Sequence, residues 1–341
     1  MTAASSRASR IPALDFTKGA LVLIMVLYHW INYFYGPTDN RYLRFLTPSF
    51  IFITGFLISN IYLSKYGIAD PHLPRRLIQR GLKVFGVFVF LNVTRLVLVR
   101  ESFPSQASPV RAPFRTLFDV YILGSGVGGG QAKAVAFFVL LPISYLLMLS
   151  AVLLVGCKVY RYTFYVVCLL FLLGIIALNF VGLQSANLEL ITIGLMGVIT
   201  GYLPIEKVNA LVRHPYLLSI AYVLYLGAIT LWNVIYPLQI VGVYLSLMII
   251  YLLGLKSGEP GKVRAVVVLL GKYSLFGYIA QIAVLQFLRQ GLNHIDIDSG
   301  VPVLGLSFVL AFALTILSVE IVNRARAGST TVDKLYKTVF A

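Results

Sequence analysis

The sequence predicts an all-α polytopic membrane protein with about ten transmembrane helices and both termini in the cytoplasm. Its 341 residues are 59% hydrophobic and only 12% charged, with a mean hydropathy of +0.88. A soluble domain of this length could not bury so much apolar surface, so lipid must be part of the solvent. The apolar residues also form long unbroken runs rather than alternating with polar ones, which favours helices over a barrel.

Ten apolar runs are long enough to cross a bilayer, which takes about 20 residues for a helix. The sixth run is short, and the ninth either contains Gly271-Lys272 or begins nearer 270, with 263–270 as an amphipathic lead-in. The runs lie at roughly 17–36, 45–64, 81–99, 134–156, 163–183, 188–204, 215–233, 237–255, 264–288 and 301–323.

The first run follows a short basic segment, as in a secretory signal peptide. It carries Lys18 and His29, however, and no small-residue cleavage site follows it. We therefore expect an uncleaved first helix. The two cysteines, Cys157 and Cys168, imply no disulfide framework and are expected to be packing residues.

The basic residues are distributed unevenly between the two sides of the predicted bundle. With the N-terminus inside, twenty of the 28 Lys and Arg fall in cytoplasmic segments, which predicts an inner-membrane protein with both termini cytoplasmic. The same bias accounts for the net charge of +16, so we expect lipid rather than nucleic acid as the partner. The chain is expected to be one domain over 1–341, with a long outer loop near 100–133. That loop is interpreted either as a lid or as a connector with a short interfacial helix around Phe114–Leu123.

Lys18 and His29 are the most informative pair of residues. They are eleven residues apart, close to three helical turns, so both lie on one face with ~16 Å between them along the axis. Asp15 precedes Lys18 by three residues on the same face. Among the four histidines, His29 alone falls inside an apolar run, where an ionisable group is costly and points to function. It can serve as a general base, or be a core histidine bonded to a neighbouring helix.

Two further features are a cluster of basic side chains before the third run and a group of small residues in the second. Arg75, Arg76 and Arg80, with Lys83, lead into the third run and suit a phosphate, although the positive-inside bias explains them equally well. Small residues in the second run, around Gly55, favour close helix packing.

Two apolar runs carry polar residues that are expected to face the bundle interior. Ser274, Tyr278 and Gln281 form one stripe in the ninth run, and Asn92 and Arg95 lie together in the third. Glu320 is expected to pair with Arg324, at i,i+4, rather than to do chemistry.

Taken in order, these motifs resemble the acyltransferase-3 clan of integral membrane O-acyltransferases, which includes the periplasmic-glucan succinyltransferase type. The resemblance rests on Leu-Asp-x-x-Lys-Gly at 14–19, His29, the Thr-Gly-Phe-Leu-Ile run at 54–58, Arg-Arg-x-x-x-Arg at 75–80 and Gly-x-x-Ser-Leu-x-x-Tyr at 271–278. It covers the first ~90 residues and returns at 269–281, while the middle of the chain contributes only its helix count.

The resemblance implies an enzyme that moves an acyl group from cytoplasmic acyl-CoA to a hydroxyl of an extracytoplasmic glycan or lipid-linked sugar, a polysaccharide modification. Acyl-CoA would be the donor substrate, and no metal is expected. His29 would be the catalytic base, Lys18 would be the equivalent of the motif's arginine, and Asp15 would be a further catalytic residue of the motif. Arg75, Arg76 and Arg80 would bind the CoA phosphates.

Two positions depart from the family pattern. Lys18 replaces the family's arginine and cannot form a bidentate fork, and Gln281 stands where a histidine is usual and cannot shuttle a proton. Two other functions therefore stay open. One is a transporter or flippase for an anionic or sugar-lipid solute that uses Arg95 and the polar stripe, and the other is a non-catalytic protein on the acyltransferase scaffold.

Overall fold

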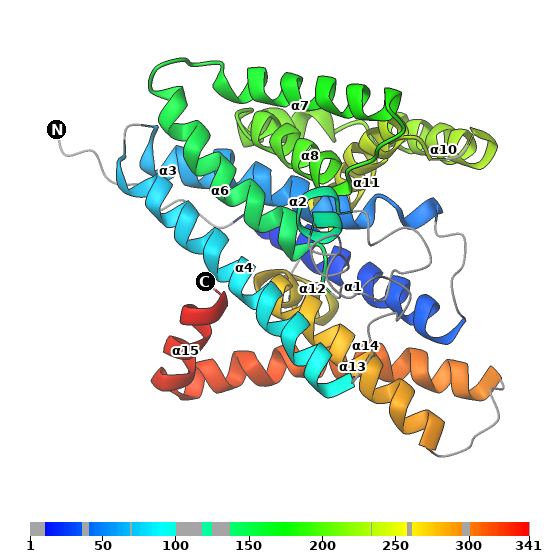
Figure 1. Ribbon diagram of the computed structural model, residues 1–341. Coiled ribbons are helices and arrows are strands. Elements are labelled where there is room, and N and C mark those ends of the chain that lie inside the picture. Colours follow the sequence, from blue (N-terminus) through cyan, green and yellow to red (C-terminus); the bar gives the residue numbers. More distant parts are fainter. Residues whose placement is uncertain are drawn as a thin grey trace, which may run out of the picture. The chain divides into compact units, whose positions relative to one another are not determined.

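The computed structural model describes residues 11–35, 41–68, 70–99, 118–124, 137–232, 234–257, 261–294 and 301–340. In this part of the chain all regular structure is helical (Figure 1), with no strand. Among the described residues, eight helices are long and apolar enough to cross a membrane, and two bent helix pairs bring the number to ten if each pair is one span. The predicted fold class, a polytopic helical membrane protein, is confirmed.

The chain divides into two compact units, which we describe separately. The first unit comprises 1–50 and 206–341, and the second comprises 51–205, so that the boundary falls within α2 (Leu46–Leu57).

The first unit holds the N-terminal and C-terminal helices. Its elements are α1 (Pro12–Phe34), η1 (Arg41–Leu43), α9 (Ile205–Leu211), α10 (Pro215–Trp232), α11 (Tyr236–Lys256), α12 (Lys262–Lys272), α13 (Ser274–His294), α14 (Val301–Gly328) and α15 (Thr330–Phe340). Helix α1 contacts α11, α12, α13 and α14, and is therefore the central helix of this unit. Its residues Leu21, Val22, Met25 and Val26 are almost fully buried, as expected for a helix enclosed by others.

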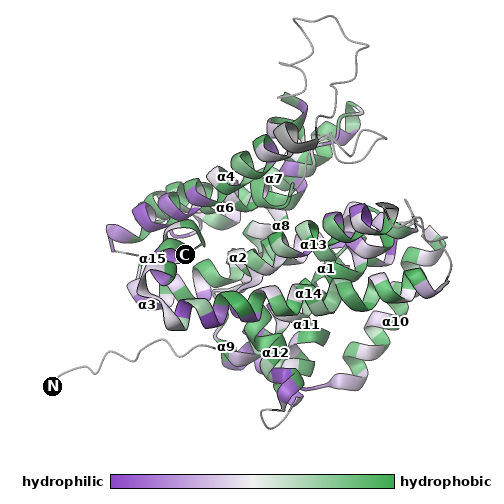
Figure 2. Ribbon diagram, turned by 90° about the horizontal axis from the view of Figure 1, so that it is seen from below, coloured by the Kyte–Doolittle hydropathy of each residue, from purple (hydrophilic) through white to green (hydrophobic). Residues whose placement is uncertain are grey.

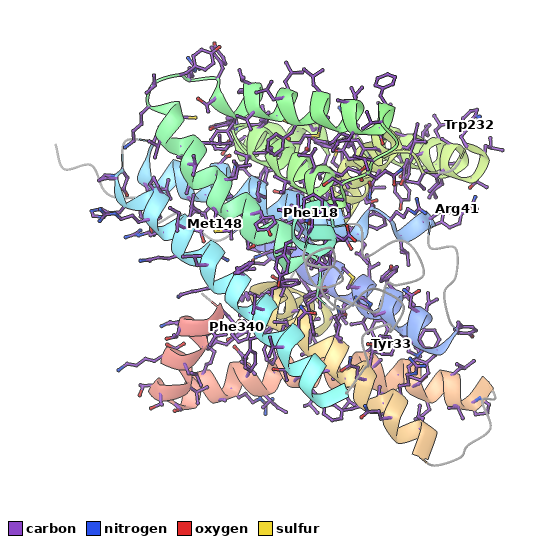
Figure 3. All side chains as sticks on the ribbon, in the orientation of Figure 1. Tyr33, Arg41, Phe118, Met148, Trp232 and Phe340 are labelled. Carbon is purple, nitrogen blue, oxygen red and sulfur yellow. The ribbon has the colours of Figure 1, made fainter. Side chains whose placement is uncertain are left out.

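The second unit continues α2 into a π-helix, η2 (Ile58–Leu63), and one further turn, α3 (Ser64–Tyr66). It then comprises α4 (His72–Val99), η3 (Asp119–Leu123), α6 (Leu140–Cys157), α7 (Thr163–Phe180) and α8 (Ala186–Thr200). Helices α4 and α6 pack along each other, with Met148 between them (Figure 3) against Gly81.

The close packing expected around Gly55 is observed between α2 and α8. A Cβ atom on Gly55 would lie 2.0 Å from the carbonyl oxygen of Gly194, so only glycine permits this approach. One turn later the hydroxyl of Ser59 donates to the carbonyl of Val198, at 2.5 Å.

The end of the predicted outer loop is anchored to the helices of the second unit. The ring of Tyr121 lies 6.0 Å from that of Phe88, edge to face, and the Asn187 amide donates to the carbonyls of Val120, Tyr121 and Ile122, at 3.1 to 3.3 Å. The described part of the expected interfacial helix is therefore a short π-helix held by α8. Residues 100–117 and 125–133, including most of the glycine run, lie outside the described residues.

The ninth apolar run is two helices, with α12 and α13 bent by 96° at Tyr273. This agrees with the amphipathic lead-in considered for 263–270, although the break falls a few residues later. The third helix begins at His72 rather than near 81, because its polar first turns extend the helix beyond the apolar run. The Glu320–Arg324 ion pair is confirmed at 2.8 Å, and both cysteines are free.

The C-terminal helix α15 was not predicted, because its eleven residues are too few for an apolar span. It leaves the end of α14 at a sharp angle (Figure 1) and is held there by Arg326. The Arg326 guanidinium donates to one oxygen of Asp333, at 2.6 and 3.0 Å, and lies 4.1 Å from the ring centre of Tyr336 and 5.3 Å from that of Tyr273. Because Tyr273 is the residue at the bend, these contacts of Arg326 and α15 stabilise the break between α12 and α13.

We expect the contacts that hold α15 against Arg326 to weaken in acid. Hydrogen bonds from Lys337 and Arg326 lower the pKa of the Asp333 carboxyl, so the ionised form favours the docked helix. The stabilisation is complete above the pKa of an unperturbed aspartate, about 3.9, and is lost as the pH falls through the lower folded-state pKa. Amide hydrogen exchange, corrected for its intrinsic pH dependence, should show constant protection of α15 down to about pH 4 and falling protection below it. Asp333→Asn should show no such dependence; an equal acid response in this variant would contradict the role of Asp333.

Candidate functional site

Six of the predicted site residues lie in the first unit, on α1 and α13. Asp15, Lys18 and His29 are on α1, and Ser274, Tyr278 and Gln281 are on α13, which packs against α1. Helix α1 runs without a break from Pro12 to Phe34, so the spacing argument holds and Lys18 and His29 share one face about 16 Å apart.

The first turns of α1 hold a largely enclosed ion pair. The ammonium of Lys18 lies 2.6 Å from a carboxylate oxygen of Asp15, and the two side chains are 19% and 12% exposed. The hydroxyl of Thr17 donates back to the carbonyl of Ala13, at 2.8 Å, so it is satisfied within the helix.

This pair sits where the backbones of α1 and α12 touch. A Cβ atom on Gly271 would lie 1.7 Å from the carbonyl oxygen of Asp15, and one on Gly19 would lie 1.8 Å from that of Val267. Two glycines, one on each helix, therefore allow the bent end of α12 to rest directly on the turn that carries Asp15 and Lys18.

Removing one charge of the pair should destabilise the protein more than removing both. Lys18→Met leaves the enclosed Asp15 carboxylate without its cation, which we expect to cost about 2 kcal/mol of the free energy of unfolding. Asp15→Asn combined with Lys18→Met should recover most of this loss, because no uncompensated charge remains. The measurement is thermal unfolding of the purified variants in one detergent.

The exposed pair of α14 provides the control for this experiment. Arg324 is 79% exposed, so Arg324→Met should change the unfolding midpoint very little. If Lys18→Met and Arg324→Met lowered the unfolding midpoint equally, the α1 pair would not be enclosed.

His29 lies three turns further along α1, and it is half-buried. Its ring meets that of Tyr28 edge to face, with centroids 5.1 Å apart. Tyr278 of α13 is buried, and α13 packs against α1. The helix that carries His29 therefore contacts the helix that carries the polar stripe.

Within that stripe Tyr278 and Gln281 are buried and Ser274 is half-buried. The Tyr278 ring packs 6.3 Å from that of Phe50, whereas the amide of Gln281 is 0% exposed and makes no hydrogen bond to any described residue. The arrangement offers an imidazole and an unused carboxamide on neighbouring helices.

No family model, curated protein or solved structure matches this chain. The chemistry of the site therefore rests on its own residues.

The predicted phosphate-binding arginines belong to the second unit, at the hydrophilic start of α4 (Figure 2). Arg75, Arg76 and Arg80 are exposed, and no described carboxylate pairs with them. Arg76 lies 4.5 Å from the ring centre of Tyr66, and Arg80 donates a hydrogen bond to the hydroxyl of Tyr62. Cation–π contacts leave N–H groups available, so the cluster can bind an anion.

The other polar pair of α4 is less informative. The Asn92 amide donates to the carbonyl of Phe88, one turn earlier in the same helix, at 2.9 Å. Arg95 is part of the helix, but its side chain lies outside the described residues.

The sequence did not predict a pocket in the second unit, with a volume of about 520 Å³. It lies beside η2 and the end of α8, and its polar walls include Ser59 and Asn60. The Asn60 amide donates to the carbonyls of Gly201 and Leu203, at 3.3 and 3.1 Å, and so caps the end of α8. Only the Gly201-Tyr-Leu-Pro break in the apolar run signalled this feature, and the pocket contains none of the predicted site residues.

Proposed function

We propose that this protein is a membrane-bound acyltransferase with His29 as its general base. The observation that carries the proposal is the composition of α1. The central helix of the first unit bears an enclosed Asp15–Lys18 pair at one end and an imidazole three turns further in, and it packs against α13, which carries the polar stripe. Such groups are costly inside a membrane protein and are retained mainly for function.

The reaction follows from general acid–base chemistry. His29 takes the proton of an acceptor hydroxyl as its oxygen attacks the thioester carbonyl of acyl-CoA. The new C–O bond forms and the C–S bond breaks, and the imidazolium then returns the proton to the departing CoA thiolate. The products are an ester and free CoA, so atoms and charges balance.

The donor is assigned by its charge, and the acceptor by the orientation of the protein in the membrane. CoA is highly anionic, and the exposed arginines Arg75, Arg76 and Arg80 are the residues we assign to its phosphates. The charge bias of the sequence supports an inner-membrane orientation with these arginines and both termini in the cytoplasm. The acceptor is then a glycan or lipid-linked sugar that reaches His29 from the other side.

The bent α12–α13 pair favours a second function, a transporter or flippase. Broken helices line substrate sites in many secondary transporters, because their unwound backbone binds solutes at mid-membrane depth. This candidate predicts movement of a sugar lipid or anionic solute without any acyl donor.

One reconstitution experiment separates the two functions. The purified protein is placed in sealed liposomes with radiolabelled acetyl-CoA or succinyl-CoA outside and either a water-soluble oligoglucan or a glucosyl lipid as acceptor. Acyl transfer predicts acceptor-dependent release of free thiol, with label recovered on the sugar. Uptake or flipping of the sugar with no thiol release would replace the proposal by the transporter, and absence of both would support a non-catalytic scaffold.

A further inference from the structure

Gln281 is the most unusual buried polar residue of the first unit. Its side chain is fully enclosed, yet neither the amide nitrogen nor the amide oxygen has a hydrogen-bond partner among the described residues. Buried amides are almost always paired, because leaving a donor and an acceptor unmade costs stability. An enclosed carboxamide with both groups free therefore calls for a partner that the described part of the chain does not provide.

The position of Gln281 on α13 shows which helices it faces. It is four residues after Gly277 and four before Leu285, so the three share one helical face. A Cβ atom on Gly277 would lie 3.3 Å from a methyl group of Val22 on α1 and 3.7 Å from one of Val319 on α14, and Leu285 belongs to a buried cluster with Val26 and Trp30 of α1 and Ala311 of α14. Gln281 therefore lies where α13 packs against both α1 and α14.

His29 belongs to the same stretch of α1. It is seven residues after Val22 and three after Val26, so it lies within about 60° of the face that these residues turn toward α13. The unpaired carboxamide and the imidazole thus belong to adjoining stretches of two contacting helices.

We propose that Gln281 binds a neutral ligand group that both donates and accepts a hydrogen bond. A carboxamide offers one acceptor and two donor hydrogens, so a secondary amide or a hydroxyl satisfies it, whereas an ion does not match its neutral pair of groups. The proposal deepens the proposed acyl transfer and rests on it for the ligand. Two sources have this chemistry: the amides of the pantetheine arm of CoA, and the hydroxyl of a sugar acceptor.

The first test needs no ligand. If Gln281 is kept for binding, Gln281→Met and Gln281→Leu remove unpaired groups while conserving volume, and the ligand-free protein should gain about 2 °C in unfolding midpoint. Gln79→Leu, at an exposed glutamine of α4, is the control and should leave the midpoint unchanged. A lower midpoint for Gln281→Met would show that Gln281 has a structural partner such as a bound water, and would overturn the proposal.

The second test identifies the source of the ligand group. Pantetheine and methyl β-D-glucoside are added separately to the wild-type protein and to Gln281→Leu. We expect at least one probe to raise the wild-type unfolding midpoint and to lose this effect in Gln281→Leu. A rise with pantetheine would show that Gln281 binds the donor, and a rise with the glucoside would show that it binds the acceptor. A shift that persists in the variant, or no wild-type response to either probe, would overturn the proposal.

These measurements are independent of catalysis. Neither the ligand-free midpoint nor the probe-induced shift requires acyl transfer, so either can succeed if the reconstituted protein transfers no acyl group. Conversely, acyl transfer with an unresponsive Gln281 would leave the proposed function intact and remove only the role of this residue.

Discussion

Replacing His29 with alanine is expected to reduce acyl transfer by roughly 10²–10⁴-fold, the range that general base catalysis contributes. Without the imidazole the acceptor hydroxyl must lose its proton to water, and the CoA thiolate leaves without a proton donor nearby. His29→Gln should be equally inactive, because an amide can form the hydrogen bonds of an imidazole but cannot take up the proton. The measurement is the initial rate of thiol release in liposomes at saturating acyl-CoA.

Two controls distinguish a loss of catalysis from unfolding and from a general effect of removing a histidine. The unfolding midpoint of His29→Gln should stay near that of the wild type, since glutamine keeps a polar side chain of similar length at this half-buried position. His214→Ala, at an exposed histidine just before α10 in the same unit, should retain the full rate. Unchanged transfer by His29→Ala would end the proposed mechanism, whatever the enzyme's substrate.

Gly271→Ala is expected to cause the largest loss of stability, about 3 kcal/mol of the free energy of unfolding. Its new Cβ atom would stand 1.7 Å from the carbonyl oxygen of Asp15. The backbone fixes the positions of both atoms, so no side-chain rotation can relieve the clash. Helices α1 and α12 would have to separate, which also displaces the turn that carries the Asp15–Lys18 pair. The measurement is the unfolding midpoint, together with the yield of monodisperse protein in detergent.

Gly291→Ala provides the matched comparison on α13. A Cβ atom there meets nothing within 4 Å, so this change should be neutral or slightly stabilising. Gly19→Ala, whose Cβ would lie 1.8 Å from the carbonyl oxygen of Val267, should behave like Gly271→Ala. Equal midpoints for Gly271→Ala and Gly291→Ala would show that α1 and α12 are not in backbone contact.

Local features of the chain were predictable from the sequence wherever the bilayer or the helical repeat determines them. A span must contain about 20 apolar residues, so the runs located most of the helices. The i,i+4 spacing likewise predicted the Glu320–Arg324 pair, and the i,i+3 spacing placed Asp15 and Lys18, which form an ion pair, on one face, because both partners belong to one helix.

The remaining differences have another cause. The 96° bend at Tyr273 falls a few residues after the lead-in expected at 263–270, and α15 is too short to register as a span. The bend is braced from outside, by Arg326 packed between Tyr273 and Tyr336. Contacts between residues more than fifty positions apart leave no trace in local composition.

The sequence by itself determined a helical membrane protein, its apolar runs, and the shared face of Lys18 and His29, because these follow from residue spacing along single helices. Only the tertiary structure decided that α1 is the central helix of its unit, that Gly271 lies on the turn of Asp15, and that Gln281 is enclosed without a partner among the described residues. Burial and hydrogen-bond satisfaction depend on which helices meet, and helices meet through side chains far apart in the chain.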